Sequence, residues 1–160
     1  MRSFQVFSSM SPEQATRMLG VLKEKTPGMY VQALVAASVA MKARPRFLQK
    51  QPVEKQAQAV RRAMARVTSD AAASEILAVY FLECRKELLV EWLDAIGLAH
   101  EDGILEADAP PQPKDTRLKK AANAFLSAVD DTDRPLLLAA FAAQDSVNWP
   151  VLESLLAERS

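Results

Sequence analysis

The sequence predicts an all-α protein, a single-domain bundle of about seven helices around one long central helix. Glycine is scarce, with 4 residues in 160, while alanine and leucine are abundant. No run of β-branched residues alternates with polar ones, as it would in a half-buried strand. Capping residues and prolines stand in front of most apolar segments, which is typical of helix starts. The one exception to helix is a short β-like hairpin that we expect near residues 98–106.

The first part of the chain contains three predicted helices. The first follows Ser11, a candidate N-cap, and has Pro12 at its first position. The second covers about residues 29–43 and is apolar almost all round, which predicts burial by neighbours on several sides. The third begins at Pro52, runs to about residue 67, and carries one apolar stripe at spacings of three and four.

The segment 71–96 is predicted to be one continuous helix, roughly 39 Å long at about 1.5 Å per residue. Its apolar residues cover more than one face, which favours a central position in the bundle. Gly97 follows directly, where a left-handed capping residue belongs. Asp102 and Gly103 then favour a tight turn with positive φ, and so a small hairpin.

Three further helices are predicted after a proline-rich connector at residues 109–114. They cover about 117–129, 130–144 and 148–158, each with capping residues, acids or a proline in its first turn. The length suits one domain, so we predict a single domain over 1–160, with the connector as the place for a sub-boundary.

The cysteine count, the N-terminal sequence and the length of the most apolar window indicate a soluble protein of the cytoplasm. The single cysteine, Cys84, cannot form an internal disulfide, which favours a reducing compartment. No signal peptide is apparent at the N-terminus. The most apolar window, 31–41, is far shorter than the roughly 18–20 residues that a membrane-spanning helix needs. We therefore expect no membrane association.

Motifs for catalysis or metal binding are missing. One histidine and one cysteine cannot supply the roughly four ligands of a structural zinc site. There is no phosphate-binding loop, no dinucleotide fingerprint and no HExxH motif. The sequence therefore predicts no catalytic residue, no cofactor and no metal, which favours a protein that is not an enzyme.

One loop nevertheless holds candidate site residues. The only histidine, His100, is followed directly by Glu101 and Asp102. Two interpretations stay open. The loop is a structural corner after a long helix, or His100 ligates or titrates there beside the two carboxylates, which would raise its pKa if they stayed close.

Charge is segregated along a chain whose 20 basic and 20 acidic side chains cancel. Between residues 42 and 66 one acid, Glu54, stands among eight bases, which form a candidate binding surface for a partner or for phosphate: Lys42, Arg44, Arg46, Lys50, Lys55, Arg61, Arg62 and Arg66. Between residues 70 and 115 there are eleven acids and three bases. Four of these acids recur at spacings of four, four and three and predict an acidic stripe on the long helix: Glu83, Glu87, Glu91 and Asp94. A carboxylate metal site would need Glu-x-x-His on a facing helix, and the chain has none.

Three arrangements of these charges stay open. The basic and acidic segments pair within one molecule, they dock between copies as a homodimer or head to tail, or the basic face binds nucleic acid or another phosphate ligand near Phe47.

The leading functional hypothesis is a non-catalytic helical module for protein interaction, regulation or assembly. Phosphate or nucleic-acid binding through residues 42–66 is the alternative. A small-molecule enzyme or sensor, with its pocket between the long helix and the loop at His100, is the third.

Overall fold

The computed structural model describes residues 1–128 and 131–159 and confirms the all-α prediction. Ten α-helices, a 3-10 turn, a π-helical segment and one small hairpin make up the described part of the chain, more helices than the sequence predicts. Two predicted boundary residues, Val129 and Asp130, lie outside the described residues. The division into domains stays a prediction.

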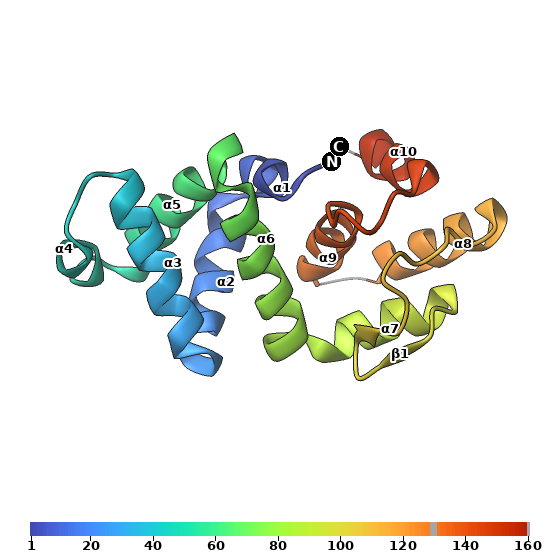
Figure 1. Cartoon of the computed structure of the whole chain (residues 1–160). Coiled ribbons are helices and arrows are strands. Elements are labelled where there is room, and N and C mark those ends of the chain that lie inside the picture. Colours follow the sequence, from blue (N-terminus) through green and yellow to red (C-terminus); the bar gives the residue numbers. More distant parts are fainter. Residues whose placement is uncertain (129–130, 160) are drawn as a thin grey trace.

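Six of the helices form the first half of the molecule (Figure 1). In this half α2, α3 and α5 pack against one another, and α1 lies against α5 and α6. As predicted, Ser11 caps α2, because its hydroxyl accepts the backbone N–H of Gln14 at 3.1 Å. The elements are α1 (Ser3–Ser9), α2 (Pro12–Lys25), α3 (Pro27–Ala40), α4 (Pro45–Gln49), α5 (Val53–Met64), the 3-10 turn η1 (Val67–Ser69) and α6 (Asp70–Val79).

The second half is built around α9, which contacts α1, α6, α7, α8 and α10. Both chain termini lie near α1 and α10 (Figure 1), and the N-terminal amine forms an ion pair with Glu153 at 2.6 Å. The elements are the π-helical η2 (Tyr80–Cys84), α7 (Lys86–Ile96), β1 (His100–Glu101), β2 (Ile104–Leu105), α8 (Asp115–Leu126), α9 (Asp133–Ala142) and α10 (Pro150–Arg159).

The predicted hairpin is confirmed. His100 pairs with Leu105 and Glu101 with Ile104 in an antiparallel register. Gly97 caps α7 in the left-handed conformation, with φ of 72°, and Asp102 and Gly103 form the turn with φ of 53° and 90°. A residue with a side chain at Gly103 would meet the Leu89 side chain at 3.1 Å. Glycine is therefore needed there both for its positive φ and for the close approach.

The prediction of one continuous helix over 71–96 is wrong. The segment is helical, but it widens into a π turn at Tyr80–Cys84 and breaks at Arg85, whose φ and ψ are −131° and 43°. The Arg85 amide closes the wide turn by donating to the Tyr80 carbonyl at 3.0 Å. Figure 1 shows α6 and α7 running in clearly different directions on either side of this break. The apolar residues of 71–96 cover more than one face because the two halves of the segment pack against different neighbours.

A cluster of charged and polar side chains holds the break. The Arg85 guanidinium donates to both Asp131, at 2.8 Å, and the buried Asp133. Asp133 also accepts the Tyr80 hydroxyl at 2.6 Å and lies 3.5 Å from Arg17 of α2. Burial and the hydrogen bond to Asp133 raise the pKa of the Tyr80 phenol well above its ordinary value, so it stays a donor. The cluster joins α2, η2 and the start of α9.

The prediction that the second helix is buried on several sides is also wrong. Only one face of α3 packs against neighbours, and the row Val31, Val35 and Val39 is exposed. Val39 is 72% exposed, which leaves this row of α3 without cover from the described residues.

The core runs through both halves. Every α-helix contributes at least one side chain to a continuous cluster of buried apolar residues. In the second half the rings of Trp92, Phe125, Phe141 and Trp149 contact one another, and the Trp149 indole N–H donates to the Pro110 carbonyl at 3.0 Å. This hydrogen bond ties the proline-rich connector to the chain just before α10. Across residues 1–128 and 131–159, no helix has both the length and the apolar character needed to cross a membrane.

The carboxyls of Asp131 and Glu87 should make stability depend on pH. Burial acts to raise the pKa of each, but hydrogen bonds from Arg85 outweigh it and hold the pKa below its ordinary value. A carboxyl of this kind stabilises the fold above its unfolded pKa, about 3.9 for Asp and 4.3 for Glu. That contribution is lost as the pH falls through the lower folded pKa.

We therefore expect the free energy of unfolding, measured by urea titration, to be level from about pH 7 to 5 and to fall below about pH 4. Asp131→Asn should make this fall shallower. Asp102→Asn, at an exposed hairpin position, is the matched control and should leave it unchanged. An equally steep fall in the Asp131→Asn variant would contradict the assigned role of this carboxyl.

Candidate functional site

The most distinctive surface feature of the first half is a groove between the end of α3, α4 and α5. Its volume is about 530 Å³, within the range of roughly 300–1,000 Å³ typical of binding pockets. Its apolar lining comes from Ala40, Met41, Phe47, Leu48, Ala59 and Ala63. We call this feature the docking groove.

Two large apolar side chains of the docking groove lie open to solvent. Phe47 of α4 is 56% exposed and Met41 is 48% exposed. Leu48, the neighbour of Phe47, is buried and anchors the short α4 to the core. Because α4 has only five residues, burial of Leu48 rather than intrinsic helix stability holds it in place.

Basic side chains form the rim of the docking groove. Lys55 and Arg62 of α5 and Arg66 line it, together with the acid Glu54. Arg66 donates to the Ala40 carbonyl at 3.4 Å, which joins the two sides of the groove. Lys55 and Arg62 are exposed.

The arrangement in which the basic and acidic segments pair within one molecule is wrong for the described residues. None of the eight bases between residues 42 and 66 is among the ion pairs of residues 1–128 and 131–159. Arg61 is the one that is partly buried, and it donates to Gln58 and to the Met10 carbonyl. The other seven are exposed: Lys42, Arg44, Arg46, Lys50, Lys55, Arg62 and Arg66.

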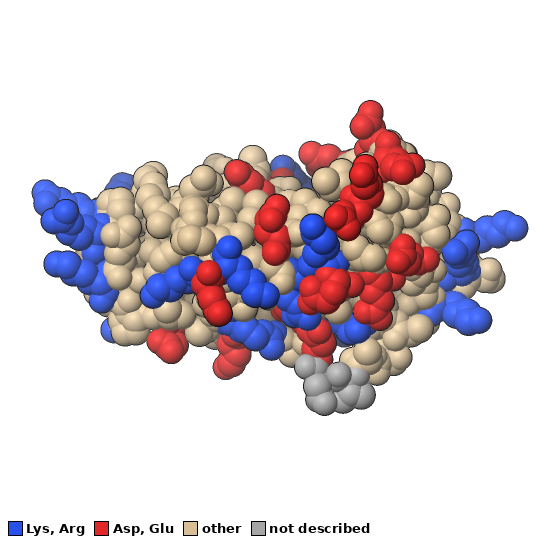
Figure 2. All heavy atoms as spheres, turned by 90° about the horizontal axis from the view of Figure 1, so that it is seen from below, with Lys and Arg blue, Asp and Glu red and all other residues tan. Residues whose placement is uncertain are grey.

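The charge distribution is visible in Figure 2. Basic side chains project from the end of the molecule that α4 forms and also from the opposite end, whereas most acidic ones lie between these two ends. The α4 end therefore presents an uncompensated positive field on a molecule with no net charge.

The predicted acidic stripe does not form one row, because the break at Arg85 separates Glu83 from the other three acids. On α7 each remaining acid has a partner inside the chain. Glu87 accepts from Arg85 at 2.8 Å, Glu91 binds Arg134 through two hydrogen bonds, and Asp94 contacts His100 at 2.7 Å. Three of the four acids are thus used within the fold.

His100 fastens the hairpin to α7. Its Nδ1 accepts the Gly103 backbone N–H at 3.1 Å, which places the ring proton on Nε2. Nε2 then donates to Asp94 at 2.7 Å. Both ring nitrogens are engaged, and the side chains of Glu101 and Asp102 are exposed on the hairpin. The structure assigns this loop a local structural task.

The described residues contain no group of three or more His, Cys, Asp or Glu side chains that could hold a metal ion. The buried Cys84 lies 3.8 Å from the Thr26 hydroxyl, beside α2. Comparison with known proteins finds no matching family model, no matching curated protein and no matching solved structure.

Sequence reasoning found the basic half of the docking groove and missed its apolar half. The sequence indicates Phe47 only as a neighbour of the bases, and it predicts that Met41 lies inside a buried helix. An all-apolar helix carries no signal of which face stays uncovered, because that depends on which elements pack around it.

If the apolar side chains of the docking groove are unpartnered, truncating them should leave the fold stable. We expect Phe47→Ala to change the free energy of unfolding by no more than about 0.5 kcal/mol. Leu48→Ala, the matched core control one residue away, should cost about 2–5 kcal/mol. Urea titrations of both variants measure this difference, and equal costs would contradict the description of Phe47 as an open surface residue.

Proposed function

We propose that the protein is a helical interaction module that binds an acidic amphipathic helix of a partner protein in the docking groove. One observation carries this proposal: an open apolar floor lies beside basic side chains that have no ion-pair partner among the described residues. On α7, by contrast, Glu87, Glu91 and Asp94 each have a partner within the chain.

The apolar floor supports a partner that brings apolar side chains. Contiguous exposed apolar surface on a folded protein marks interaction sites more often than chance placement. Covering it would contribute about 25 cal/mol for each Å² removed from water. Met41 adds to this because methionine adapts its shape to different partners. A helix laid in such a groove contributes apolar residues at spacings of three and four.

The basic rim supports a partner with acidic flanks. Lys55 and Arg62 stand at the edge of the docking groove, where an approaching carboxylate would meet them in water. Such rim charges mainly raise the association rate and set specificity. Lys42, Arg44, Arg46 and Lys50 extend the positive field around α4, which would steer an acidic segment toward the groove.

Phosphate or nucleic-acid binding is the alternative for the same surface. The seven exposed bases favour it. The position of Phe47 and Met41 beside the basic rim disfavours it, because a phosphate backbone would leave these side chains uncovered. The groove can bury apolar side chains, and a phosphate backbone has none to place there.

A direct test is fluorescence anisotropy with a labelled synthetic helix of roughly 15 residues. The peptide carries leucines along one face and glutamates on both flanks. We expect saturable binding that weakens with salt. Arg62→Glu should weaken it at least about tenfold, equivalent to about 1.4 kcal/mol. Lys119→Glu, a charge reversal at an exposed position on α8, is the matched control and should have little effect.

Several outcomes would contradict the proposal. The same peptide with lysines in place of glutamates should not bind, and equal affinity would exclude recognition by the basic rim. Binding of a DNA duplex but not of the peptide would favour the phosphate alternative. A concentration-dependent dimer in sedimentation experiments that Phe47→Asp abolishes would place a second copy of this chain in the groove instead of a partner protein.

A further inference from the structure

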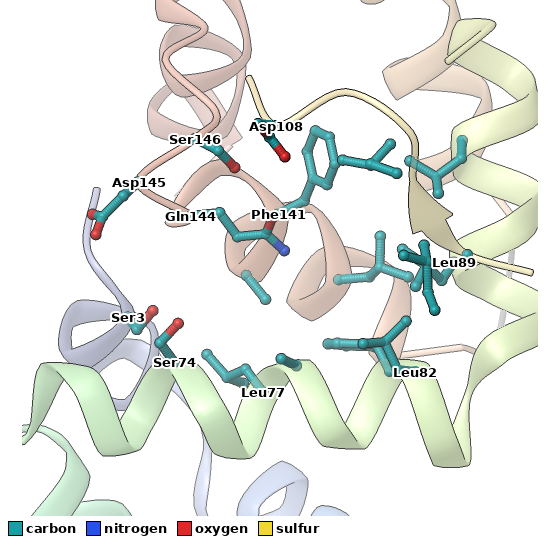
Figure 3. Close-up of a pocket in the computed structure, with 18 of the residues that line it drawn as sticks. Ser3, Ser74, Leu77, Leu82, Leu89, Asp108, Phe141, Gln144, Asp145 and Ser146 are labelled. Carbon is teal, nitrogen blue, oxygen red and sulfur yellow. The ribbon is translucent and has the colours of Figure 1, made fainter. Parts of the chain in front are cut away.

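A second cavity lies between the two halves of the molecule, and it is independent of the docking groove. Its volume is about 420 Å³, again in the range that holds small molecules. It is bounded by α6, α7, the hairpin, α9 and the segment that follows α9 (Figure 3). We call it the hairpin pocket. It lies between the helices and the loop that contains His100, although His100, Glu101 and Asp102 do not line it.

One side of the hairpin pocket is apolar. Leu82 and Leu89 stand together on that side in Figure 3, and Phe141 lies above them, beside Asp108. Leu89 and Phe141 are buried, with the main chain of Gly103 against Leu89. The hydrogen bond from Gly103 to His100, and from His100 to Asp94, fixes this wall of the pocket. His100 is therefore a positioning residue for the wall.

The opposite side of the hairpin pocket is polar and acidic. Figure 3 shows Asp108, Gln144, Asp145 and Ser146 on this side, above Ser3 and Ser74. The side chains of Asp108, Gln144 and Asp145 make no hydrogen bond or ion pair within the part of the chain that the structure describes. The lining contains two carboxylates and no lysine, arginine or histidine.

From this arrangement we propose that the hairpin pocket binds a small amphipathic molecule with an apolar body and a protonated amine as its head group. The apolar body would lie between Leu82, Leu89 and Phe141, and the ammonium would lie beside Asp108 and Asp145. An ammonium with a pKa near that of lysine, about 10.4, is charged at neutral pH. An anionic head group would meet two carboxylates and no cation, so the pocket selects against it.

The test uses three probes that share one alkyl chain: decylammonium, 1-decanol and decanoate, each below its micelle concentration. Binding is followed by NMR of the leucine methyl groups. We expect shifts at Leu82 and Leu89, with decylammonium binding at least about tenfold more tightly than decanoate and 1-decanol between them. Equal affinity for all three, tighter binding of decanoate, or no saturable shift would overturn the proposal.

Two double variants test whether the carboxylates of the pocket recognise the head group of the ligand. The double variant Asp108→Asn/Asp145→Asn changes exposed side chains and should bring decylammonium to within about threefold of 1-decanol. Glu101→Gln/Asp102→Asn, on the same hairpin but outside the lining, is its matched control and should retain the preference. A preference that survives the first variant would exclude the acidic side as the head-group site.

A third variant fills the cavity. Ala78 of α6 lines the hairpin pocket and is only partly buried, so Ala78→Phe should abolish binding of all three probes while circular dichroism shows an intact helical fold. Unchanged binding would overturn the proposed location. If this variant does not fold, the carboxamide variants above still decide the question.

Discussion

The bend at Arg85 is the constraint on which the rest of the structure depends. Arg85 leaves the helix at the end of η2 and binds Asp131 and Asp133, while Tyr80 from the same turn donates to Asp133. Burial lowers the pKa of Arg85, but the hydrogen bonds that it donates to Asp131 and Glu87 outweigh this and raise the pKa above its ordinary value, so the guanidinium stays charged. A buried carboxylate such as Asp133, with a side chain 1% exposed, is strongly unfavourable without such partners. The cluster therefore fixes one geometry for the chain at the junction of the two halves.

This junction determines where the hairpin pocket lies. Because α7 turns away from α6, a cavity opens between them, and the hairpin closes it through the bonds of His100 to Gly103 and Asp94. The acids of α7 do not form an exposed stripe, because each contacts a basic side chain or the histidine of the second half. The eight bases between residues 42 and 66 form no ion pair with the described residues, which leaves the α4 end positively charged.

Local signals in the sequence predicted the elements well and their packing poorly. Ser11 with Pro12, and Gly97 with Gly103, specify a helix start and a hairpin through backbone preferences that act over a few residues. The break at Arg85 carries no proline or glycine, and its partners stand 46 and 48 residues away in the chain. Of the candidate sites, the basic side chains around α4 could be predicted, because a run of charged residues is visible in the composition of the sequence. The apolar floor around Phe47 and the hairpin pocket were not, since both depend on which faces the fold leaves uncovered.

The most direct test of this account is a double-mutant cycle between Arg85 and Asp133, with Arg85→Met, Asp133→Asn and the pair of substitutions compared by urea unfolding. Arg85→Met alone should cost about 3–5 kcal/mol, because it leaves the buried Asp133 carboxylate without its main cation. In the double variant the cost should be clearly less than the sum of the two single costs, with a coupling energy above about 1.5 kcal/mol. Additive costs would contradict the claim that this buried pair holds the bend between α6 and α7.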